Sequence, residues 1–459
     1  MPYVQHTEAE QREMLQVIGV RRLEDLFAAI PAEIRLQRPL DLPAGKSEYE
    51  VLRDIAALGS RNHPAGSMVS FLGGGAYDGI VPSVVGAILS RSEFYTAYTP
   101  YQAEISQGTL QTIYEFQTMV ANLTGMDLAN ASMYDGATAM AECALLLAHD
   151  SDRKRVLVPA ALHPRYRAVL DTYASDVDLE IATLPCGRDG RLDLERLPAA
   201  CDAATGVLVL QQPNFFGQVE DAPALRRVLD DMPAERRPEL LVATADPVSL
   251  GVLVPPGEYG AAIAVGDGQA LGIAPTFGGP VVGFVACTKA HVRKIPGRLV
   301  GATVDVEGKR GYVLTLQTRE QHIRREKATS NICTNQALLA LAVTVYLAAL
   351  GESGLRELAH MLLVKSHRLA DAVRRLPGYG LRFEAPFFRE FVVRCPRPAR
   401  EIVAAAKAEG VLAGLDVTTH FPRALPGLDE RDLAVAVTEK RSDAEIDAFA
   451  ALLGRLGGR

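Results

Sequence analysis

The sequence lacks several patterns that would place it in other broad classes of protein. Its six cysteines are scattered and include no C-x-x-C pair, which argues against a zinc cluster or disulfide framework and favours a reducing compartment. The net charge of −7 leaves no basic excess for binding nucleic acid. The first residues include neither the basic region nor the apolar region that a secretory signal has, which argues against such a signal. The most apolar helix candidate, residues 337–350, is shorter than the ~18 residues that cross a bilayer. We therefore expect a cytoplasmic protein with no membrane span.

A second absence is local, because no lysine or arginine occurs between Asp246 and Thr288. The short apolar run at 240–245 is typical of a buried strand, and Asp246 follows at its carboxyl end. Two more apolar runs, 261–265 and 281–286, flank a stretch rich in glycine and proline. Open α/β sheets bind ligands at the carboxyl ends of their strands, so Asp246 is a candidate ligand-binding residue.

This arrangement resembles a cofactor site without its covalent anchor. In pyridoxal-phosphate (PLP) enzymes of the aspartate aminotransferase fold type, a strand-end aspartate contacts the pyridine nitrogen, and a lysine about two dozen residues later forms a Schiff base. Gln269 stands near the position of that lysine. Glutamine forms no imine with an aldehyde, so we expect Asp246 to be vestigial in this chain.

Apolar runs and amphipathic stretches alternate from residue 155 to 286. This order predicts an α/β fold with a mostly parallel sheet that helices cover on both faces, as in PLP-dependent transferases of fold type I. The loop 211–217 leaves the carboxyl end of a predicted strand and is expected to reach the same crevice as Asp246. The glycine-rich stretch Phe71–Asp78 predicts a turn with a close approach of its backbone.

With 459 residues, the chain exceeds what one hydrophobic core usually supports. We expect a helical arm at 1–60, a large PLP-transferase-like domain at 61–330 and a smaller α/β domain at 331–459. The clearest strands of the smaller domain are 390–394 and 433–437. The arm has no core pattern of its own, so packing on the body and packing on a partner remain equal alternatives. Its predicted helices are 8–17, 24–29 and 47–58.

The segment Phe94–Gly108 is the most unusual polar stretch, with three tyrosines, two glutamines and a glutamate around Pro100. Its amphipathic periodicity is poor, which predicts a loop. Aromatic hydroxyls and amides on a loop that leads into a helix suit a small polar ligand. A well-hydrogen-bonded surface turn explains the same composition, and the sequence does not decide between the two.

Two predicted helices follow this loop. Residues 108–123 have apolar residues at helical spacing, and Gly125 closes the helix. A second helix, ending near residue 148, starts after Asp135. The backbone amides at that start could hold a phosphate, but capping by Asp135 is the commoner arrangement.

The polar, basic segment 309–334 is open to two interpretations. A charged run is usually a solvated face. The cations Arg324, Arg325 and Lys327, followed by Thr329–Asn331, could instead bind a carboxylate or a phosphate.

Four motifs identify a family resemblance that extends along essentially the whole chain. They resemble the amino-terminal half of the glycine cleavage system P-protein. These motifs are Tyr98-Thr-Pro-Tyr-Gln-Ala-Glu-Ile-Ser-Gln-Gly108, Ala129-Asn-Ala-Ser132, Gly266-Asp-Gly-Gln-Ala-Leu-Gly272 and Arg325-Glu-Lys-Ala-Thr-Ser-Asn-Ile-Cys-Thr334.

The resemblance implies a function and a set of partners. The family decarboxylates glycine with PLP, releases CO2 and passes the aminomethyl group to the lipoyl arm of the H-protein. In many organisms one chain carries two homologous halves, with the Schiff-base lysine in the second. This chain resembles the first half alone, the alpha subunit (subunit 1) of the split form. PLP would then be held by the partner subunit 2 in an α2β2 assembly, and the T- and L-proteins of the system would be further partners.

The resemblance also implies site residues and leaves alternatives. Lys327 is expected to make an ionic or phosphate contact and not a Schiff base. One alternative function is a non-catalytic scaffold that stabilises the PLP-bearing subunit and docks the H-protein, and another is a stand-alone enzyme. The expected catalytic residues are Tyr95, Tyr98, Tyr101, Gln102 and Glu104, and the expected substrate- or interface-binding residues are Ser106, Gln107, Thr329, Ser330 and Asn331.

Overall fold

The computed structural model describes residues 5–421 and 427–458. The chain divides into two compact units, Met1–His63 and Pro64–Arg459. The first unit holds helices α1 (Glu8–Ile18) and α2 (Glu48–Gly59) and the 3-10 helix η1 (Leu23–Phe27), which confirms the three predicted helices. Both α helices start with a capping box, and neither has a buried residue. The domain boundaries expected after residues 60 and 330 stay predictions.

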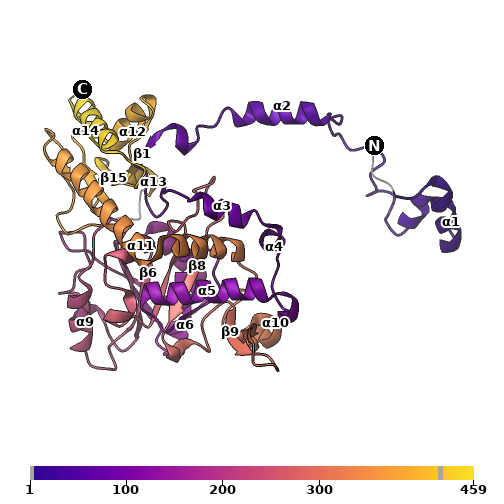
Figure 1. Cartoon of the computed structure of the whole chain (residues 1–459), viewed down its shortest axis with the longest axis horizontal. Coiled ribbons are helices and arrows are strands. Elements are labelled where there is room, and N and C mark those ends of the chain that lie inside the picture. The colour runs from indigo at the N-terminus through magenta and orange to yellow at the C-terminus, as the bar shows by residue number, and fades with distance from the viewer. Residues whose placement is uncertain (1–4, 422–426, 459) are drawn as a thin grey trace. The chain divides into compact units, whose positions relative to one another are not determined.

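The second unit, called the body below, is built on a seven-stranded sheet (Figure 1). The strand order is β2-β8-β7-β6-β5-β3-β4. The strands from β3 to β7 pair in parallel, whereas β8 is antiparallel to both of its neighbours, so the predicted mostly parallel sheet is confirmed. The strands are β2 (Leu128–Ala129), β3 (Arg155–Pro159), β4 (Glu180–Leu184), β5 (Thr205–Gln211), β6 (Glu239–Thr244), β7 (Ile263–Asp267) and β8 (Gly283–Cys287).

Helices cover both faces of this sheet, because its central strands are apolar on both sides. Along β5, Val207 and Val209 belong to one core, and Leu208 and Leu210 belong to the other. The first core includes residues of α6 (Gly136–Asp150) and α7 (Pro164–Ala174). The second includes residues of α5 (Gln107–Thr124), α9 (Ala222–Asp230) and α11 (Ala337–Arg374). The predicted three-layer architecture is thus confirmed.

Helix α11 is long and apolar enough, by length and composition, to pass as a membrane span. Gly351 interrupts it with φ 64° and ψ −177°, which leaves the predicted segment 337–350 as its uninterrupted first part. Ala342 in this part lies in the core beside α5, as Figure 1 shows for the two helices. This placement makes α11 a core helix of the body.

The carboxyl-terminal part of the body forms a second sheet, with the order β11-β12-β15-β14 and only antiparallel pairs. Helices α12 (Ala399–Ala408) and α14 (Asp443–Gly457) pack on it, and Phe391, Leu433 and Phe449 share its core. Both strands predicted in this region are confirmed. The strands are β11 (Gly380–Leu381), β12 (Glu390–Arg394), β14 (Leu415–Asp416) and β15 (Asp432–Ala436).

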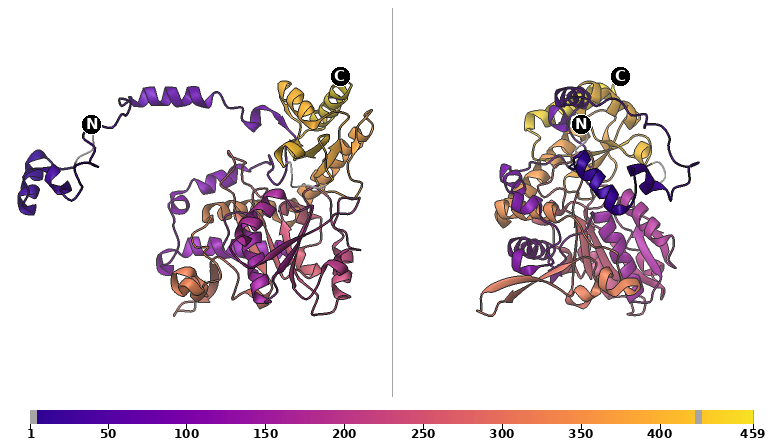
Figure 2. Two further views of the ribbon diagram at one scale, coloured as in Figure 1. Left: turned by 180° about the vertical axis from the view of Figure 1, so that it is seen from behind. Right: turned by 90° about the vertical axis from the view of Figure 1, so that its right-hand side faces the viewer.

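Several elements of the body were not predicted, and the largest of them is a hairpin. Residues that read as a polar, basic segment contain strand β10 (Arg310–Thr315), which pairs antiparallel with β9 (Leu299–Val304). Figure 2 shows this hairpin extending away from the rest of the body. The remaining regular elements are β1 (Val69–Ser70), which pairs with β13 (Val411–Leu412), and the short helices α3 (Ser83–Leu89), α4 (Ser92–Tyr95), α8 (Leu197–Ala200), α10 (Gln321–Arg324) and α13 (Val417–His420).

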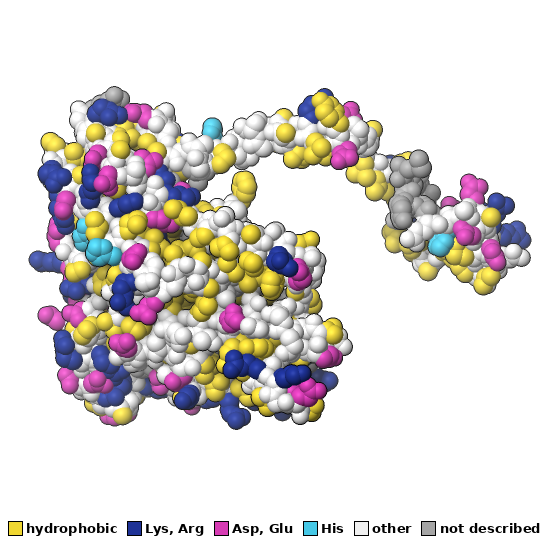
Figure 3. All heavy atoms as spheres, viewed as in Figure 1, with side chains coloured by type: hydrophobic (Ala, Val, Ile, Leu, Met, Phe, Trp, Pro, Cys, Tyr) yellow, Lys and Arg dark blue, Asp and Glu magenta, His cyan; other side chains and the backbone are white. Residues whose placement is uncertain are grey.

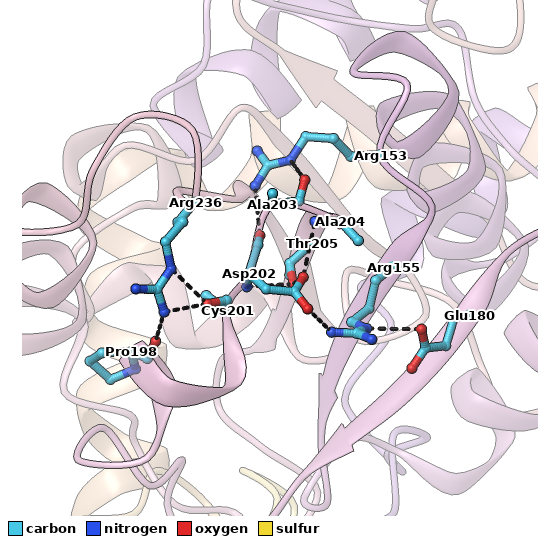
Figure 4. Close-up of polar contacts among 10 residues, drawn as sticks. All are labelled: Arg153, Arg155, Glu180, Pro198, Cys201, Asp202, Ala203, Ala204, Thr205 and Arg236. Carbon is cyan, nitrogen blue, oxygen red and sulfur yellow. Dashed lines mark hydrogen bonds and ion pairs between the residues drawn. The ribbon is translucent and has the colours of Figure 1, made fainter.

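Polar contacts fix the amino edge of the large sheet, the edge opposite Asp246 (Figure 4). Arg153 donates to the carbonyl of Ala203 (3.1 Å), and Arg236 donates to the carbonyl of Cys201 (3.1 Å). Arg155 contacts both Glu180 and Asp202. Arginines from separate segments therefore hold the loop before β5 at this edge.

Candidate active site

Asp246 lies at the carboxyl edge of the sheet, where its carboxylate forms an ion pair with Arg389. Asp246 follows β6 and is 4% exposed. Arg389, at the residue before β12, donates from Nε (2.5 Å) and Nη2 (2.6 Å) to the two carboxylate oxygens. Burial raises the pKa of the Asp246 carboxyl, and the Arg389 guanidinium opposes that rise. In this bidentate pair both Asp246 oxygens accept from Arg389, so a pyridine N–H would have to compete with the guanidinium for them.

The glycine-rich stretch Phe71–Asp78 fills the space beside this pair. The Tyr77 ring lies over the Arg389 guanidinium, 3.6 Å from centroid to Cζ. The Tyr77 hydroxyl donates to Glu390 (2.5 Å), and the Gly74 amide donates to the same carboxylate (2.6 Å). A Cβ atom on Gly73 would meet Glu390 Oε1 at 2.0 Å, so the predicted close approach at this turn is confirmed.

Little room is left in the crevice. Its cavity is about 10 Å³ and is lined by Tyr77, Asp246 and Arg389 together with residues of the loop 211–217. The prediction that this loop reaches the crevice of Asp246 is therefore confirmed. A cavity of this size holds at most one water molecule.

Gln269 is bound into the crevice wall. It is 2% exposed, and its Oε1 accepts from the Tyr77 amide (2.8 Å). Its Nε2 donates to the carbonyls of Tyr77 (3.0 Å) and Ile273 (2.7 Å). The residue near the expected lysine position thus joins two backbone segments.

Carboxylates occupy the amides that could have held a phosphate. Asp135 caps α6 by accepting from the Thr138 amide (2.8 Å), which confirms the capping alternative. Asp267 accepts from the amides of Gly136 (3.3 Å) and Gln269 (2.9 Å). Burial raises the pKa of Asp267 to about 7. The Asp135 carboxylate, and Asp267 in its ionised form, repel an anion at this helix start. The residues of this crevice therefore do not fit PLP.

A separate cavity of about 210 Å³ lies beside the tyrosine-rich segment 94–108. The loop predicted there is the link between α4 and α5, with one 3-10 turn at Ala103–Ile105. The Tyr98 hydroxyl contacts Thr334 Oγ1 at 3.1 Å, so the loop joins the segment that precedes α11. The polar lining includes Tyr95, Tyr98, Thr99, Arg298, Thr334 and Asn335.

Arg298 holds the tyrosine-rich loop through a hydrogen bond to Tyr101. It is 5% exposed and is the one charged residue that lines the cavity. Its Nη2 donates to the Tyr101 hydroxyl (2.9 Å), and its Nη1 donates to the carbonyl of Cys333. Glu320 Oε2 lies 3.5 Å from its Nε and supplies a counter-charge. Arg298 thus holds the Tyr101 hydroxyl, whereas Tyr95 and Tyr98 line the cavity themselves.

The structure separates the residues that the sequence grouped as catalytic. Tyr95 and Tyr98 line the cavity. The Tyr101 hydroxyl accepts a hydrogen bond from Arg298, which lines the cavity. Gln102 and Glu104 are exposed. Within the part of the chain that the structure describes, neither has a side-chain hydrogen bond to another residue.

The residues expected to bind substrate or the interface are also dispersed. Gln107 contacts β10, accepting from the Tyr312 amide (2.9 Å) and donating to its carbonyl (2.9 Å). Ser106 is half-buried at the start of α5, and Asn331 is exposed. The Ser330 hydroxyl accepts from the Ile332 amide (3.1 Å). The role of each of these residues stays a prediction.

Thr329 and Lys327 line a different cavity of about 920 Å³. Lys154, which precedes β3, lines the same cavity, so this cavity lies toward the amino edge of the sheet. Lys327 is therefore remote from Asp246, and an ionic contact remains its expected role.

Several polar lining residues of the tyrosine-loop cavity were missed in the sequence, among them Thr334, Asn335 and Arg298. Thr334 closes one family motif, and Asn335 follows it directly. Asn335 donates to the Ser132 carbonyl (2.8 Å) and accepts from its hydroxyl (2.6 Å), which joins two motifs in space. Arg298 has no motif that would have singled it out.

The large parallel sheet, with Asp246 and Gln269 at its carboxyl edge, has the architecture of PLP-dependent enzymes of fold type I. A solved sphingosine-1-phosphate lyase of Burkholderia pseudomallei shares the fold, with 16% identity, a TM-score of 0.64 and 94% coverage of both chains. A glutamate decarboxylase of Lactobacillus brevis has 12% identity and a TM-score of 0.67, over 93% of this chain and 96% of that chain. At such identities the likeness shows the fold alone.

Closer relatives show the family. The family model for the glycine cleavage system P-protein matches residues 1–453. "Probable glycine dehydrogenase (decarboxylating) subunit 1" of Carboxydothermus hydrogenoformans is 51% identical over 99% of both chains. The protein of the same name from Chlorobaculum tepidum is 50% identical over 100% of both. A crystal structure of glycine decarboxylase (P-protein), in inhibitor-bound form, superposes with a TM-score of 0.88 and 44% identity, over 99% of this chain and 100% of that chain. The chain belongs to the glycine cleavage system P-protein family.

Proposed function

We propose that this chain is the non-anchoring subunit of a two-subunit glycine decarboxylase of the glycine cleavage system. Together with its partner subunit it decarboxylates glycine, releases CO2 and transfers the aminomethyl group to the lipoyl arm of the H-protein. PLP is held by the partner subunit. The enzyme works in the cytoplasm as an α2β2 assembly, alongside the T- and L-proteins.

One observation carries this proposal. The residue near the Schiff-base position is Gln269, and its side chain is fully engaged with the backbone of Tyr77 and Ile273. A chain of this family that has no anchoring lysine in its crevice needs a second chain to hold PLP. The electron sink for loss of the carboxylate then lies in that chain.

The tyrosine-loop cavity is this chain's contribution to the shared site. Aromatic rings from Tyr95 and Tyr98 face a wall of hydroxyl and amide groups that includes Thr334. When the partner covers this cavity, its aromatic walls exclude water from the reacting carboxylate, which favours decarboxylation. Gln102 and Glu104 are exposed on the same loop, where a partner can reach them.

The decisive experiment is exchange of the glycine carboxyl with labelled bicarbonate in the presence of H-protein. It compares this chain alone, the lysine-bearing partner alone and the mixture. We expect exchange at the full rate only in the mixture, and visible absorbance of lysine-bound PLP only in samples with the partner. Exchange by this chain alone would refute the split site and support a stand-alone enzyme.

The scaffold alternative makes a different prediction for the same mixture. A chain that only stabilises its partner and docks the H-protein needs no tyrosines at the shared site. Substitutions in the tyrosine-rich loop would then leave the turnover of the assembled enzyme unchanged.

A further inference from the structure

The loop between β7 and β8 carries an aromatic side chain that the body does not use. Phe277 is 97% exposed, and residues 274–278 around it are all exposed. Its φ of 46° lies in the left-handed region, which is unfavourable for a bulky side chain. A residue that is strained and also fully exposed contributes nothing evident to the stability of this chain.

Hydrogen bonds nevertheless hold together the turn that carries Phe277. The Thr276 hydroxyl donates to the Gly279 carbonyl (3.1 Å), and the Gly279 amide donates to the Thr276 carbonyl (2.9 Å). Just before the loop, Leu271 and Ile273 are buried in the core, and Gln269 holds the Ile273 carbonyl. These contacts fix the backbone of the turn that presents Phe277 at the surface.

The surroundings of Phe277 in the sequence are uncharged. No aspartate, glutamate, lysine or arginine occurs from residue 268 to 287. Protein interfaces are depleted of charge at their centres and enriched in aromatic residues that fill pockets on the partner. An exposed, uncharged loop with a fixed phenylalanine has the properties of such a centre.

We propose that Phe277 is the aromatic anchor of the contact with the lysine-bearing partner subunit, where it fills an apolar pocket. This inference rests on the proposed function, because it requires that subunit. The loop leaves the carboxyl end of β7, the same edge as Asp246 and Gln269. Ala131, which lines the tyrosine-loop cavity, lies two residues before Met133, and Met133 pairs with Gly283 beside the end of β7. A partner that completes this cavity therefore approaches the same edge, where α/β sheets place their sites.

Exposed apolar side chains elsewhere on the body are consistent with a covered face. Hydrophobic side chains gather over α3 and α4 in Figure 3, where Val84 is 42% exposed and the preceding Ile80 is 51% exposed. The tyrosine-rich loop follows α4 directly. A partner that covers this loop would cover these side chains as well.

The test measures association with the partner subunit, independently of activity. Phe277→Ala should raise the Kd of the pair by roughly 10- to 100-fold, the usual effect of removing a buried aromatic anchor. Phe277→Gly should weaken association similarly but leave the melting temperature of the isolated chain unchanged or higher, because glycine relieves the positive φ. Val364→Ala is the matched control, since Val364 is 53% exposed on α11. It should change neither quantity.

The possible failures are distinguishable. If the wild-type chain binds the partner and both Phe277 variants bind as tightly, the inference is overturned. It is also overturned if they lose only self-association or H-protein binding, because the loop then serves another occupant. If the wild-type chain does not bind a lysine-bearing subunit at all, the proposed function fails, and the inference fails with it.

Discussion

At the scale of single residues, the tyrosine-rich loop offers the most direct test of function. Tyr98 is 74% exposed, and its hydroxyl contacts only Thr334 within the described residues. Removing that hydroxyl should leave the fold intact. We expect Tyr98→Phe to lower glycine turnover of the assembled enzyme by about 10- to 100-fold, as for other groups that position a reacting substrate. Turnover is measured by carboxyl exchange, with folding checked by thermal unfolding.

The chain offers a matched control for this substitution. Tyr49 in α2 is also 74% exposed, so Tyr49→Phe removes an equally accessible hydroxyl from outside the cavity. We expect it to leave turnover at the wild-type value. Equal activity of both variants would remove the catalytic role of Tyr98 and favour the scaffold alternative.

A second residue-scale prediction concerns Asp267, whose pKa burial raises from 3.8 to about 7. The folded chain then binds this proton more tightly than the unfolded chain does. Between about pH 4 and pH 7 the stability contribution of the protonated group is lost as the pH rises, and above pH 7 it is gone. The loss is at most about 4 kcal/mol.

Asp267→Asn should remove this dependence. The free energy of unfolding of the variant, from denaturant titrations at a series of pH values, should fall less steeply than that of the wild type between pH 4 and pH 7. Glu220, whose pKa is also raised to about 7 by burial, supplies an internal comparison because it titrates in both proteins. Identical slopes for the two proteins would show that Asp267 stays ionised throughout.

At the scale of elements, the sequence predicted what local pattern controls. The parallel strands β5 and β6 read as apolar runs because both of their faces are buried. The hairpin β9–β10 was missed because β10 is only half-buried and reads as a polar segment. The closed crevice was missed for another reason. Its central pair joins Asp246 to Arg389, which are 143 positions apart, and no local pattern encodes that contact.

For the candidate site, too, the sequence predicted residues that form a local pattern and missed those that do not. The tyrosine-rich loop was found because tyrosine, glutamine and glutamate are conspicuous around one proline. Arg298, which holds Tyr101, was not found because a single buried arginine has no pattern of its own. Gln107 was grouped with the site by its place in a motif, although its side chain is bound to β10. A motif thus locates a site more reliably than it assigns each side chain.

The helical arm is the element whose removal should matter least to the body. No residue of Met1–His63 belongs to any of the hydrophobic cores among the described residues, and the core residues begin at Phe71. We expect a chain that starts at Pro64 to keep the circular dichroism spectrum and the cooperative unfolding of the body, with a midpoint within a few degrees of the full chain. Loss of cooperative unfolding would show that the arm packs on the body. An unchanged body with weakened partner binding would assign the arm to the partner.

At the scale of the whole molecule, more than one position makes the crevice at Asp246 unsuitable for PLP. Arg389 pairs with Asp246, the Tyr77 ring packs on the Arg389 guanidinium, and Asp267 accepts from an amide at the start of α6. Restoring the anchor alone should therefore not restore the site. We expect Gln269→Lys, incubated with PLP and reduced with borohydride, to carry no pyridoxyl group at position 269 above the background of the nine native lysines. Peptide mapping by mass spectrometry provides the measurement, and circular dichroism confirms that the variant is folded.

The double variant Gln269→Lys with Arg389→Ala shows which obstacle matters. Removing Arg389 vacates the space beneath Tyr77 and frees the Asp246 carboxylate, while Asp267 remains in place. Labelling at position 269 that appears only in the double variant would identify the Asp246–Arg389 pair as the main barrier. Stoichiometric labelling of the single variant would contradict the closed crevice, because an amine at position 269 would then suffice to bind PLP. In that case the dependence on a partner subunit would rest on one substitution, and not on the packing of the whole carboxyl edge.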